Sequence, residues 1–354
     1  MPRALPNPGK GYIVHEQLGK GRWKEVYRVV VRGEWHDMAL ARFIEEPKDE
    51  DLFGEIKAIR ETPHPNVAQL YSAFRGEDGK IYLLEELLYR PLENLAPLTM
   101  VDEFYGIARD LCAGLASLHD RSRVHRDLKL DNCGIDHFGT AKIFDLGSVT
   151  SEGGMVKGTT LSRAPELFAK EAKCTRASDV WAMGAVLFAL RTGGDYPFVT
   201  KQEAQKRPQV GSARARFDKM VREKASDPNS EDILQERIRL YFPNGSAKLV
   251  SEMLRFDPTK RPTAAQCAEG WRDHLGPWVP AATPQKVNEI DIAFHDTMGY
   301  LKAFLSGTTE MSPRQWERTT TAIDQLEKRL SADRSAKLTE LRRKVAEMRQ
   351  SVTA

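Results

Sequence analysis

The strongest constraint on the fold is a short charged segment, His125-Arg126-Asp127-Leu128-Lys129-Leu130-Asp131-Asn132. It lies in a chain whose first 90 residues are rich in predicted strands and whose remainder, from about residue 99, is predominantly helical. Residues 12–44 hold three runs of β-branched and aromatic residues, a composition that predicts strands. Residues 104–118 place apolar side chains at helical spacing. The chain is therefore predicted to be an α+β protein with a polar, charged loop at residues 125–132.

Two polar residues near this loop have the character of metal ligands. Asn132 closes the loop, and Asp145 follows 13 residues later. Oxygen ligands on adjacent loops suit a hard cation such as Mg²⁺, particularly one that is also bound to phosphate.

The loop resembles the H-R-D-L-K-x-x-N catalytic loop of protein kinases. Two further motifs follow in the order typical of that family: Asp145-Leu146-Gly147 resembles D-F-G, and Ala164-Pro165-Glu166 matches A-P-E. The resemblance implies a bilobal protein-kinase fold, with an antiparallel sheet and one helix in the N-lobe and a mostly helical C-lobe. It also implies that Asp127 orients the acceptor hydroxyl, that Lys129 stabilises the transferring phosphoryl group, and that Asn132 and Asp145 bind Mg²⁺ with ATP.

The predicted nucleotide site departs from the family pattern at two positions. Residues 18–26 resemble the glycine-rich loop G-x-G-x-x-G-x-V, with Lys24 in place of the third glycine, and Ala41 occupies the position of the usual lysine on the third strand. Both departures resemble the with-no-lysine kinases, which implies that Lys24 reaches the phosphates, since a flexible ammonium can enter the site from either strand. Arg42 is a poorer substitute, because neighbouring residues on a strand point to opposite faces. The residues assigned to nucleotide binding in this segment are Leu18, Gly19, Gly21, Lys24, Val26 and Ala39.

Further nucleotide-site residues are assigned from the next segments. A helix is predicted over residues 50–61, and its Glu55 lies nine residues before His64-Pro65-Asn66, which matches the family's glutamate that supports the phosphate lysine. Residues 81–88 predict a buried strand that enters the hinge, where backbone groups near Glu86 and Leu88 are expected to meet adenine. Glu85 then falls at the gatekeeper position. A buried carboxylate there needs a partner, and the sequence leaves Lys24 and Arg42 as alternatives.

The segment from Asp145 to Glu166 resembles a short activation segment. Lys129 and Thr159 favour serine or threonine as acceptor, and Thr159 is expected to bond to Asp127 and Lys129. Arg126 is expected to meet a phosphate on one of the loop hydroxyls, with Glu152 as a partial substitute; the alternative is that these are ordinary loop residues. The hydroxyl candidates are Ser148, Thr150 and Ser151. Two structural pairs are also expected: Asp179 with the catalytic-loop backbone, and Arg261 with Glu166.

The expected domains are an N-terminal extension (1–11), a kinase domain (12–280, with the N-lobe to about residue 88 and the C-lobe from about 89) and a C-terminal helical region (281–354). The apolar spacing in the last region predicts amphipathic helices, which are expected to mediate self-association or to bind a regulatory partner. Residues 201–224 carry eight Lys or Arg against three acids, which indicates either a docking surface for an acidic partner or a solvated helix face.

Overall properties narrow the function. The net charge of +3 gives no argument for nucleic acid, no apolar run is long enough to cross a membrane, and the four cysteines form no metal-binding spacing. We expect a cytoplasmic, ATP- and Mg²⁺-dependent serine/threonine protein kinase that acts on a protein substrate. Two alternatives stay open: a pseudokinase or scaffold that binds without efficient transfer, and an active kinase silenced by an engineered Lys-to-Ala change at residue 41.

Overall fold

The structure is a computed structural model that describes residues 6–274, apart from 22, 33–36, 48, 137–138, 209–210 and 243, together with residue 343. The helices predicted within 281–354 lie outside the described residues. The helices and strands below belong to one compact unit, which comprises Met1–Arg32 and Asp37–Pro277.

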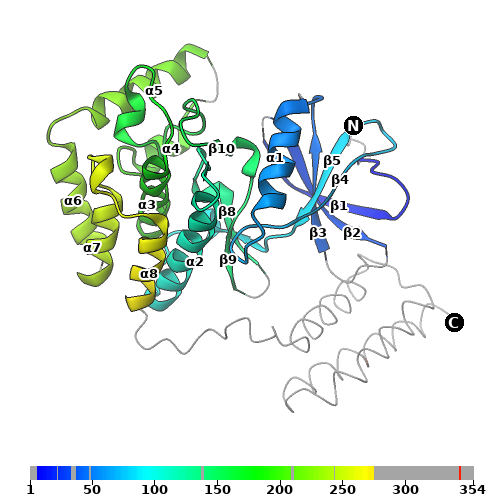
Figure 1. Ribbon diagram of the computed structural model, residues 1–354, viewed down its shortest axis with the longest axis horizontal. Coiled ribbons are helices and arrows are strands. Elements are labelled where there is room, and N and C mark those ends of the chain that lie inside the picture. Colours follow the sequence, from blue (N-terminus) through cyan, green and yellow to red (C-terminus); the bar gives the residue numbers. More distant parts are fainter. Residues whose placement is uncertain are drawn as a thin grey trace. The chain divides into compact units, whose positions relative to one another are not determined.

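The N-terminal part is a five-stranded antiparallel sheet with the strand order β1-β2-β3-β5-β4 (Figure 1). In the register of its centre, Val26 of β2 pairs with Ala41 of β3, and Ala41 pairs with Leu83 of β5. The predicted strands are confirmed, with the third ending at Phe43 rather than Ile44. The strands are β1 (Tyr12–Lys20), β2 (Lys24–Val31), β3 (Asp37–Phe43), β4 (Leu70–Arg75) and β5 (Ile81–Glu86).

The two faces of this sheet have different neighbours. Ala41, Phe43 and Leu83 belong to a core that also contains Ala58 and Ile59 of helix α1 (Asp49–Glu61), which lies along the sheet (Figure 1). Alternate residues, among them Leu40, form a separate cluster on the opposite face. Because side chains alternate along a strand, Lys24, Ala41 and Glu85 all belong to the α1 face.

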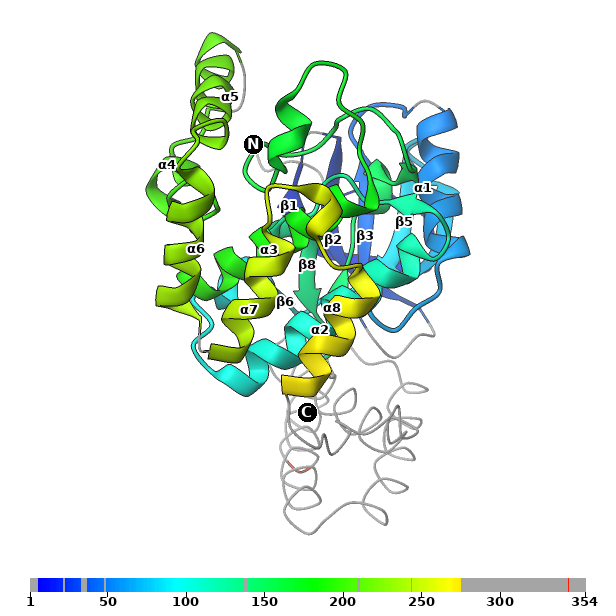
Figure 2. The same ribbon diagram turned by 60° about the vertical axis from the view of Figure 1, so that its left-hand side comes forward.

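The C-terminal part is mainly helical. The predicted apolar face of α2 is confirmed, because Phe104, Ile107, Leu111, Leu115 and Leu118 are at most 3% exposed. Phe104 and Tyr105 also lie 5.7 Å, centroid to centroid, from Trp271 of α8, so these helices pack side by side (Figure 2). The helices are α2 (Val101–His119), α3 (Arg176–Thr192), α4 (Lys201–Gln205), α5 (Gly211–Ala225), α6 (Ser230–Tyr241), α7 (Asn244–Met253) and α8 (Ala264–His274).

Five short strands and five 3-10 turns complete the described fold. Strands β6, β8 and β9 form a three-stranded sheet, and β7 pairs with β10. The strands are β6 (Arg90–Pro91), β7 (Arg123–Val124), β8 (Cys133–Ile135), β9 (Ala141–Ile143) and β10 (Thr150–Ser151). The turns are Leu92–Leu95, Leu130–Asn132, Leu146–Ser148, Pro165–Phe168 and Pro258–Lys260.

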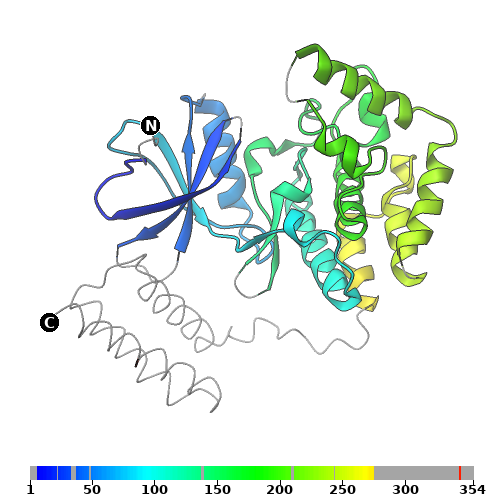
Figure 3. The ribbon, with the colours of Figure 1, turned by 180° about the vertical axis from the view of Figure 1, so that it is seen from behind.

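The sheet and the helical part are joined by the chain itself and by non-covalent contacts. The chain crosses once from β5 into β6 and α2, the cyan segment seen from behind in Figure 3. One set of these contacts is made by the segment around Asn66, whose carbonyl accepts from the Ile143 N–H at 3.0 Å and whose side chain donates to the Ala141 carbonyl at 3.0 Å. Gly114 of α2 lets the helix approach this segment, since a Cβ there would lie 2.4 Å from the Asn66 carbonyl. These contacts fix β9, and with it Asp145, beside α1.

Of the helices that the structure describes, none combines the length and the apolar character that crossing a lipid bilayer requires.

Candidate active site

The buried carboxylate of Asp179 on α3 binds the backbone of the loop at residues 125–132. Its Oδ2 accepts from the His125 backbone N–H at 2.6 Å, and its Oδ1 accepts from the Arg126 N–H at 3.0 Å. His119 Nε2 of α2 lies 3.2 Å from Oδ2 as well. The predicted role of Asp179 is confirmed. With this support Arg126 adopts a left-handed conformation (φ 70°), which costs free energy and is sustained only where surrounding bonds over-determine the backbone.

The carboxylate of Asp127 has partners at both oxygens. Oδ1 accepts from the backbone N–H of Thr159 at 2.8 Å. Oδ2 lies 3.6 Å from Lys129 Nζ and 3.4 Å from Asn132 Nδ2. The arrangement leaves Asp127 half-buried, with one oxygen fixed by the activation segment and the other turned toward the charged groups that would surround an acceptor hydroxyl.

The side chains of Asn132 and Asp145 suit a hard cation. Asn132 Nδ2 donates to the Asp127 carbonyl at 2.8 Å, so its Oδ1 stays available as a ligand. The Phe144 N–H donates to the Asn132 carbonyl at 3.0 Å, which joins the two loops. Burial opposes the charge of Asp145, but Lys24, His125 and Lys129 outweigh burial and lower its pKa, so it is ionised at neutral pH. In the described part of the chain, no cluster of three or more His, Cys, Asp or Glu competes as a metal site.

Lys24 lies at the centre of the charged groups under the sheet. Its ammonium forms an ion pair with Glu55 of α1 and lies 3.6 Å from Asp145 Oδ1. Burial disfavours the ammonium, yet Glu55, Asp145 and Glu85 together raise the pKa of Lys24, so it stays charged. The ammonium also lies 5.4 Å from the centre of the Phe43 ring, its pairing partner on β3. Lys24 therefore contacts both the helix and the predicted metal ligand, the two partners that a phosphate-binding lysine is expected to have.

Glu85, at the gatekeeper position, is the third acid beside Lys24. The pKa of Glu85 is raised to about 7: burial is the largest cause, Lys24 lowers the pKa in part, and the charges of Glu55 and Asp145 contribute to the rise. The choice left open by the sequence is thereby resolved in favour of Lys24. Arg42 lies on the opposite face of the sheet, where its Nη2 bonds to Glu25 at 2.5 Å.

The remaining residues assigned to the nucleotide lie along the sheet and the hinge. Gly21 closes the turn between β1 and β2, because its N–H donates to the Lys24 carbonyl at 2.8 Å. Ala39 is buried on β3. In the described structure, the backbone groups of Leu88 make no hydrogen bond to protein, so they are available to a ligand. The structure places Leu18 and Gly19 on β1, Val26 on β2, and Glu86 at the end of β5.

For Glu86, the expected contact with adenine stays a prediction and is restricted to its backbone carbonyl. Its backbone N–H donates to the Gln69 carbonyl at 2.8 Å, so this N–H is not available to adenine. Its side chain pairs with Lys142 of β9 at 2.6 Å, and Lys142 also lies 3.4 Å from Asp136. Glu86 therefore ties the sheet to the helical part. Lys142 had no signal in the sequence, because no motif marks it.

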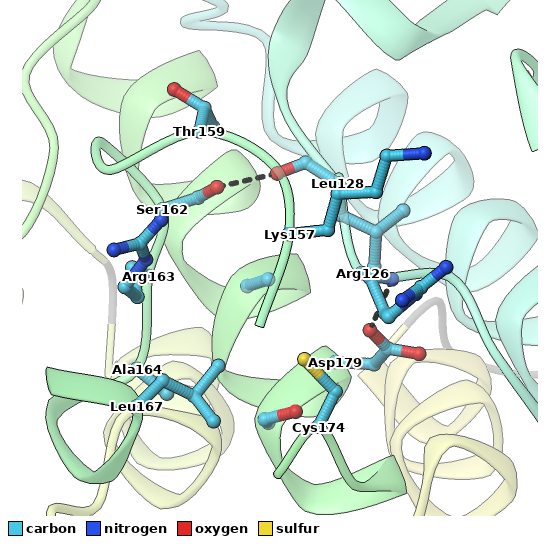
Figure 4. Close-up of a pocket in the computed structure, with 12 residues that line it drawn as sticks. Arg126, Leu128, Lys157, Thr159, Ser162, Arg163, Ala164, Leu167, Cys174 and Asp179 are labelled. Atoms are coloured by element: carbon cyan, nitrogen blue, oxygen red, sulfur yellow. Dashed lines mark hydrogen bonds between the residues drawn. The ribbon is translucent and has the colours of Figure 1, made fainter. Parts of the chain in front are cut away.

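The activation segment lies directly against the catalytic loop. Figure 4 shows Thr159, Ser162 and Arg163 opposite Arg126 and Leu128, with the Ser162 hydroxyl donating to the Leu128 carbonyl at 2.5 Å. Gly158 has a φ of 84°, and a Cβ there would lie 2.3 Å from the Arg126 carbonyl. Only glycine fits this approach without displacing the loop.

The predicted bond between Thr159 and Lys129 is wrong, although the bond to Asp127 is present through the Thr159 backbone. The Thr159 hydroxyl instead accepts from Arg207 Nη1 at 2.7 Å. In Figure 4 this hydroxyl points away from Arg126 and Asp179. Arg207, which follows α4, bonds to the Thr159 hydroxyl, whereas Lys129 lies beside Asp127.

The expected partners of Arg126 also differ. Its Nε and Nη1 donate to the backbone carbonyls of Ser148 at 2.6 Å and Met155 at 3.1 Å. Glu152 pairs with Arg176 at 3.1 Å and is not the substitute for a phosphate that the sequence predicted. In this conformation backbone carbonyls already accept hydrogen bonds from two of the guanidinium nitrogens. The hydroxyls of Ser148, Thr150 and Ser151 remain expectations as modification sites.

The basic segment 201–224 divides into two groups. Arg207, Arg214 and Lys224 are partly buried and bond within the fold, to Thr159, Asp218 and Glu203 respectively. The other basic residues are solvent-exposed. The segment is thus partly structural, and Arg207 is a site residue that its position in a charged run concealed. The exposed members are Lys201, Lys206, Arg216, Lys219 and Arg222.

The ion pair between Glu166 and Arg261 fixes the C-terminal end of the activation segment. The guanidinium forms two bonds with the carboxylate, at 2.7 and 2.8 Å, and its side chain is fully buried. This prediction is confirmed. The segment from Asp145 to Glu166 is therefore anchored at both ends.

Comparison with known proteins agrees with this architecture. A family model described as the protein kinase domain matches residues 12–271. The chain belongs to the protein kinase domain family. The antiparallel N-terminal sheet and the helical C-terminal part are the two lobes of the protein-kinase fold.

Several curated kinases are similar over most of this domain. A probable serine/threonine-protein kinase of Dictyostelium discoideum is 29% identical over 273 residues, which are 73% of this chain and 15% of that protein. The serine/threonine-protein kinase RUNKEL of Arabidopsis thaliana is 26% identical, over 81% of this chain and 20% of its own length. Serine/threonine-protein kinase 16 of Rattus norvegicus is 30% identical, over 54% of this chain and 72% of its own. The chain thus spans only a small part of the first two relatives.

Proposed function

We propose that this chain is an ATP-dependent protein kinase that transfers the γ-phosphoryl group to serine or threonine of a protein, with Lys24 in place of the absent lysine on β3. The observation that carries the proposal is the position of the Lys24 ammonium, paired with Glu55 and 3.6 Å from Asp145 Oδ1. Ala41 belongs to the same face of the sheet, so the positive charge enters the same site from the neighbouring strand.

The proposed roles follow from the geometry. Asp127 orients the acceptor hydroxyl and receives its proton at Oδ2, because Oδ1 is bonded to the Thr159 N–H. Lys129 and Lys24 place positive charge beside the transferring group, the kind of preorganised electrostatic stabilisation on which phosphoryl transfer depends. Glu55 holds Lys24 in place. Asn132 and Asp145 would hold Mg²⁺, which neutralises phosphate charge when it is bound.

Nucleotide binding would use the sheet and the hinge. The backbone of Leu88 is the group most available to adenine, and Ala39 and Val26 give an apolar surface for the base. Gly19, Gly21 and Leu18 belong to the loop that would cover the phosphates. Serine and threonine are the proposed acceptors, since Lys129 lies beside Asp127 and all three relatives described above are named serine/threonine-protein kinases.

The domain boundaries are part of the proposal. The kinase domain covers about residues 12–280, preceded by a short extension and followed by residues 281–354. The amphipathic pattern of that last region supports a role in self-association or in binding a regulatory partner.

The rival function is a pseudokinase that binds nucleotide or partners. Ala41 and the partly buried acid Glu85 favour it, whereas the contacts around Asp127 favour transfer. An engineered change at residue 41 is the third reading. It would leave the pairing of Lys24 with Glu55 without a catalytic purpose.

One experiment separates the three. The full chain is incubated with labelled ATP, Mg²⁺ and a mixture of serine- and threonine-containing peptides, beside Lys24→Met, Asp127→Asn, Ala41→Lys and the control Lys20→Met. Lys20 is also a glycine-loop lysine, but it pairs with Glu25. We expect transfer by the unmodified chain and Lys20→Met, and its loss in Lys24→Met and Asp127→Asn. Transfer only after Ala41→Lys would overturn the role of Lys24.

A further inference from the structure

Arg207 is placed where it can act on the catalytic aspartate through a single residue. Its Nη1 donates to the Thr159 hydroxyl at 2.7 Å, and the Thr159 N–H donates to Asp127 Oδ1 at 2.8 Å. The arginine and the aspartate are thus joined by two hydrogen bonds on one threonine. No motif of the sequence marks this connection, which spans 48 residues.

The placement of Arg207 is itself supported. It follows α4, whose first turn has a capping box in which Thr200 and Glu203 bond to each other's backbone. The Glu203 carboxylate also pairs with Lys224 of α5 at 2.7 Å. The Arg207 N–H donates to the Ala204 carbonyl at 3.2 Å. These bonds fix the base of the side chain, so the guanidinium is delivered to Thr159 from a rigid element.

The charge of Arg207 is not explained by a structural ion pair. In the described part of the chain, no carboxylate lies within 4 Å of its nitrogens. Burial lowers its pKa, and the neighbouring Arg214 lowers it further, while Asp131 and Asp218 only partly compensate. Burying the charge of an arginine that has no ion-pair partner costs free energy. The hydrogen bond to the Thr159 hydroxyl is the interaction that offsets part of this cost.

A cavity next to the catalytic loop adjoins the contact between Arg207 and Thr159. Thr159 and Arg207 line a cavity of about 300 Å³ together with Lys129 and Asp131 of the catalytic loop. The sequence predicted that Lys129 would bond to Thr159. Lys129 instead lies 3.6 Å from Asp127 Oδ2 and is left to face the transferring group.

We infer that Arg207 is a positioning residue for phosphoryl transfer: by holding the Thr159 hydroxyl, it fixes the Thr159 N–H that orients Asp127. This inference rests on the proposed kinase function. Misplacing a catalytic group by a fraction of an ångström lowers the rate of the chemical step more than it lowers affinity. The effect of Arg207 is therefore expected in kcat, not in the KM of either substrate.

The test compares Arg207→Ala, Thr159→Val, the double variant, Thr159→Ser and the control Arg216→Ala. Arg216 is an exposed arginine of α5 with one weak contact, 3.4 Å to Ser212. With the peptide that the unmodified chain phosphorylates fastest, we expect kcat to fall about tenfold in Arg207→Ala and in Thr159→Val, the scale of one hydrogen bond to a charged group. Thr159→Ser, which keeps the hydroxyl, should retain most of the activity, and the double variant should be no slower than either single variant.

Three kinetic outcomes overturn the inference. The first is a rise in acceptor KM with unchanged kcat, which would make Arg207 a substrate-binding residue. The second is a double variant as slow as the product of the single effects, and the third is an Arg207→Ala enzyme as fast as Arg216→Ala. Amide hydrogen exchange of residues 158–161, measured without nucleotide, provides a second test that needs no activity. Exchange there should be faster in Arg207→Ala than in Arg216→Ala, while exchange in α2 and α3 is unchanged in both. Unchanged exchange in 158–161 would refute the inference. If the unmodified chain shows no transfer, the kinase function fails separately, and exchange alone decides whether Arg207 holds Thr159.

Discussion

Replacing Lys24 by methionine tests the central charge of the site through stability as well as activity. Methionine keeps the unbranched stem that lies against Phe43 but removes the ammonium. Glu55, which is 5% exposed, then loses its cation, and the carboxylates of Asp145 and Glu85 lose the charge that lowers their pKa values. The expected result is a destabilised domain with little or no phosphoryl transfer.

The size of the effect follows from burial. Breaking a buried ion pair by removing one partner costs about 3–5 kcal/mol. The Lys24 side chain retains 18% of its exposure, so water screens part of the loss and the lower figure applies. About 3 kcal/mol corresponds to a fall in Tm of about 6–12 °C for a domain of this size. The loss should shrink at lower pH, because protonation removes the uncompensated carboxylate charges.

The assay is urea-induced unfolding at pH 6 and pH 8, with Lys20→Met as the matched variant. Lys20 pairs with Glu25 at 2.8 Å, but its side chain is 44% exposed and Arg42 bonds to the same carboxylate. Its removal should cost less than about 1 kcal/mol. The reasoning is refuted if Lys24→Met loses no more stability than Lys20→Met, or if its loss is equal at the two pH values.

Three further changes have defined outcomes. Glu85→Gln removes a carboxyl whose pKa is raised to about 7. In the unmodified chain this carboxyl holds a proton that unfolding releases, so its contribution to stability is lost as pH rises from 5 to 8. Over that range the variant should therefore gain about 2–3 kcal/mol relative to the unmodified chain in urea unfolding. Gly158→Ala puts a methyl group 2.8 Å from Asp127 Oδ1 at a φ of 84°; kcat should fall at least about 100-fold with near-native circular dichroism, and full activity would contradict the close approach. Arg261→Ala leaves the partly buried Glu166 without its cation; thermal unfolding should show a loss of about 3 kcal/mol, and an unchanged Tm would mean that water replaces the pair.

Much of the site was predictable because its parts are local in sequence or fixed by strand geometry. Asp127, Lys129 and Asn132 lie in one loop, so their proximity needs no tertiary information. The failure of Arg42 as a substitute for the missing lysine follows from the alternation of side chains along β3, and the structure places Arg42 with Glu25 on the other face. Regular periodicity likewise predicted the buried face of α2.

The rest depended on where long side chains from distant segments end. An arginine has several rotatable bonds and five donors, so its partner is decided by whichever acceptor the fold brings within reach. Arg126 therefore bonds to backbone carbonyls and not to Glu152, and Arg207 reaches Thr159 across 48 residues. Neither contact leaves a pattern in the sequence. The run of basic residues around Arg207 even pointed to a solvated surface or a docking surface, because charge composition does not reveal which members are buried.

Under the proposed function, the relation between Lys24 and Ala41 accounts for a phosphate site without a lysine on β3. In the antiparallel register, Lys24 is opposite Phe43 and Val26 is opposite Ala41, so all four belong to the same face of the sheet. Residue 24 lies on the strand next to residue 41, and its pairing partner Phe43 lies two residues beyond Ala41 on β3. A lysine side chain with four carbons can span this displacement. The small side chain of Ala41, 1% exposed, fits in the apolar core beneath the sheet. A second lysine there would have to share Glu55 with Lys24, so the two departures from the family pattern are compatible with each other, and each would be costly alone.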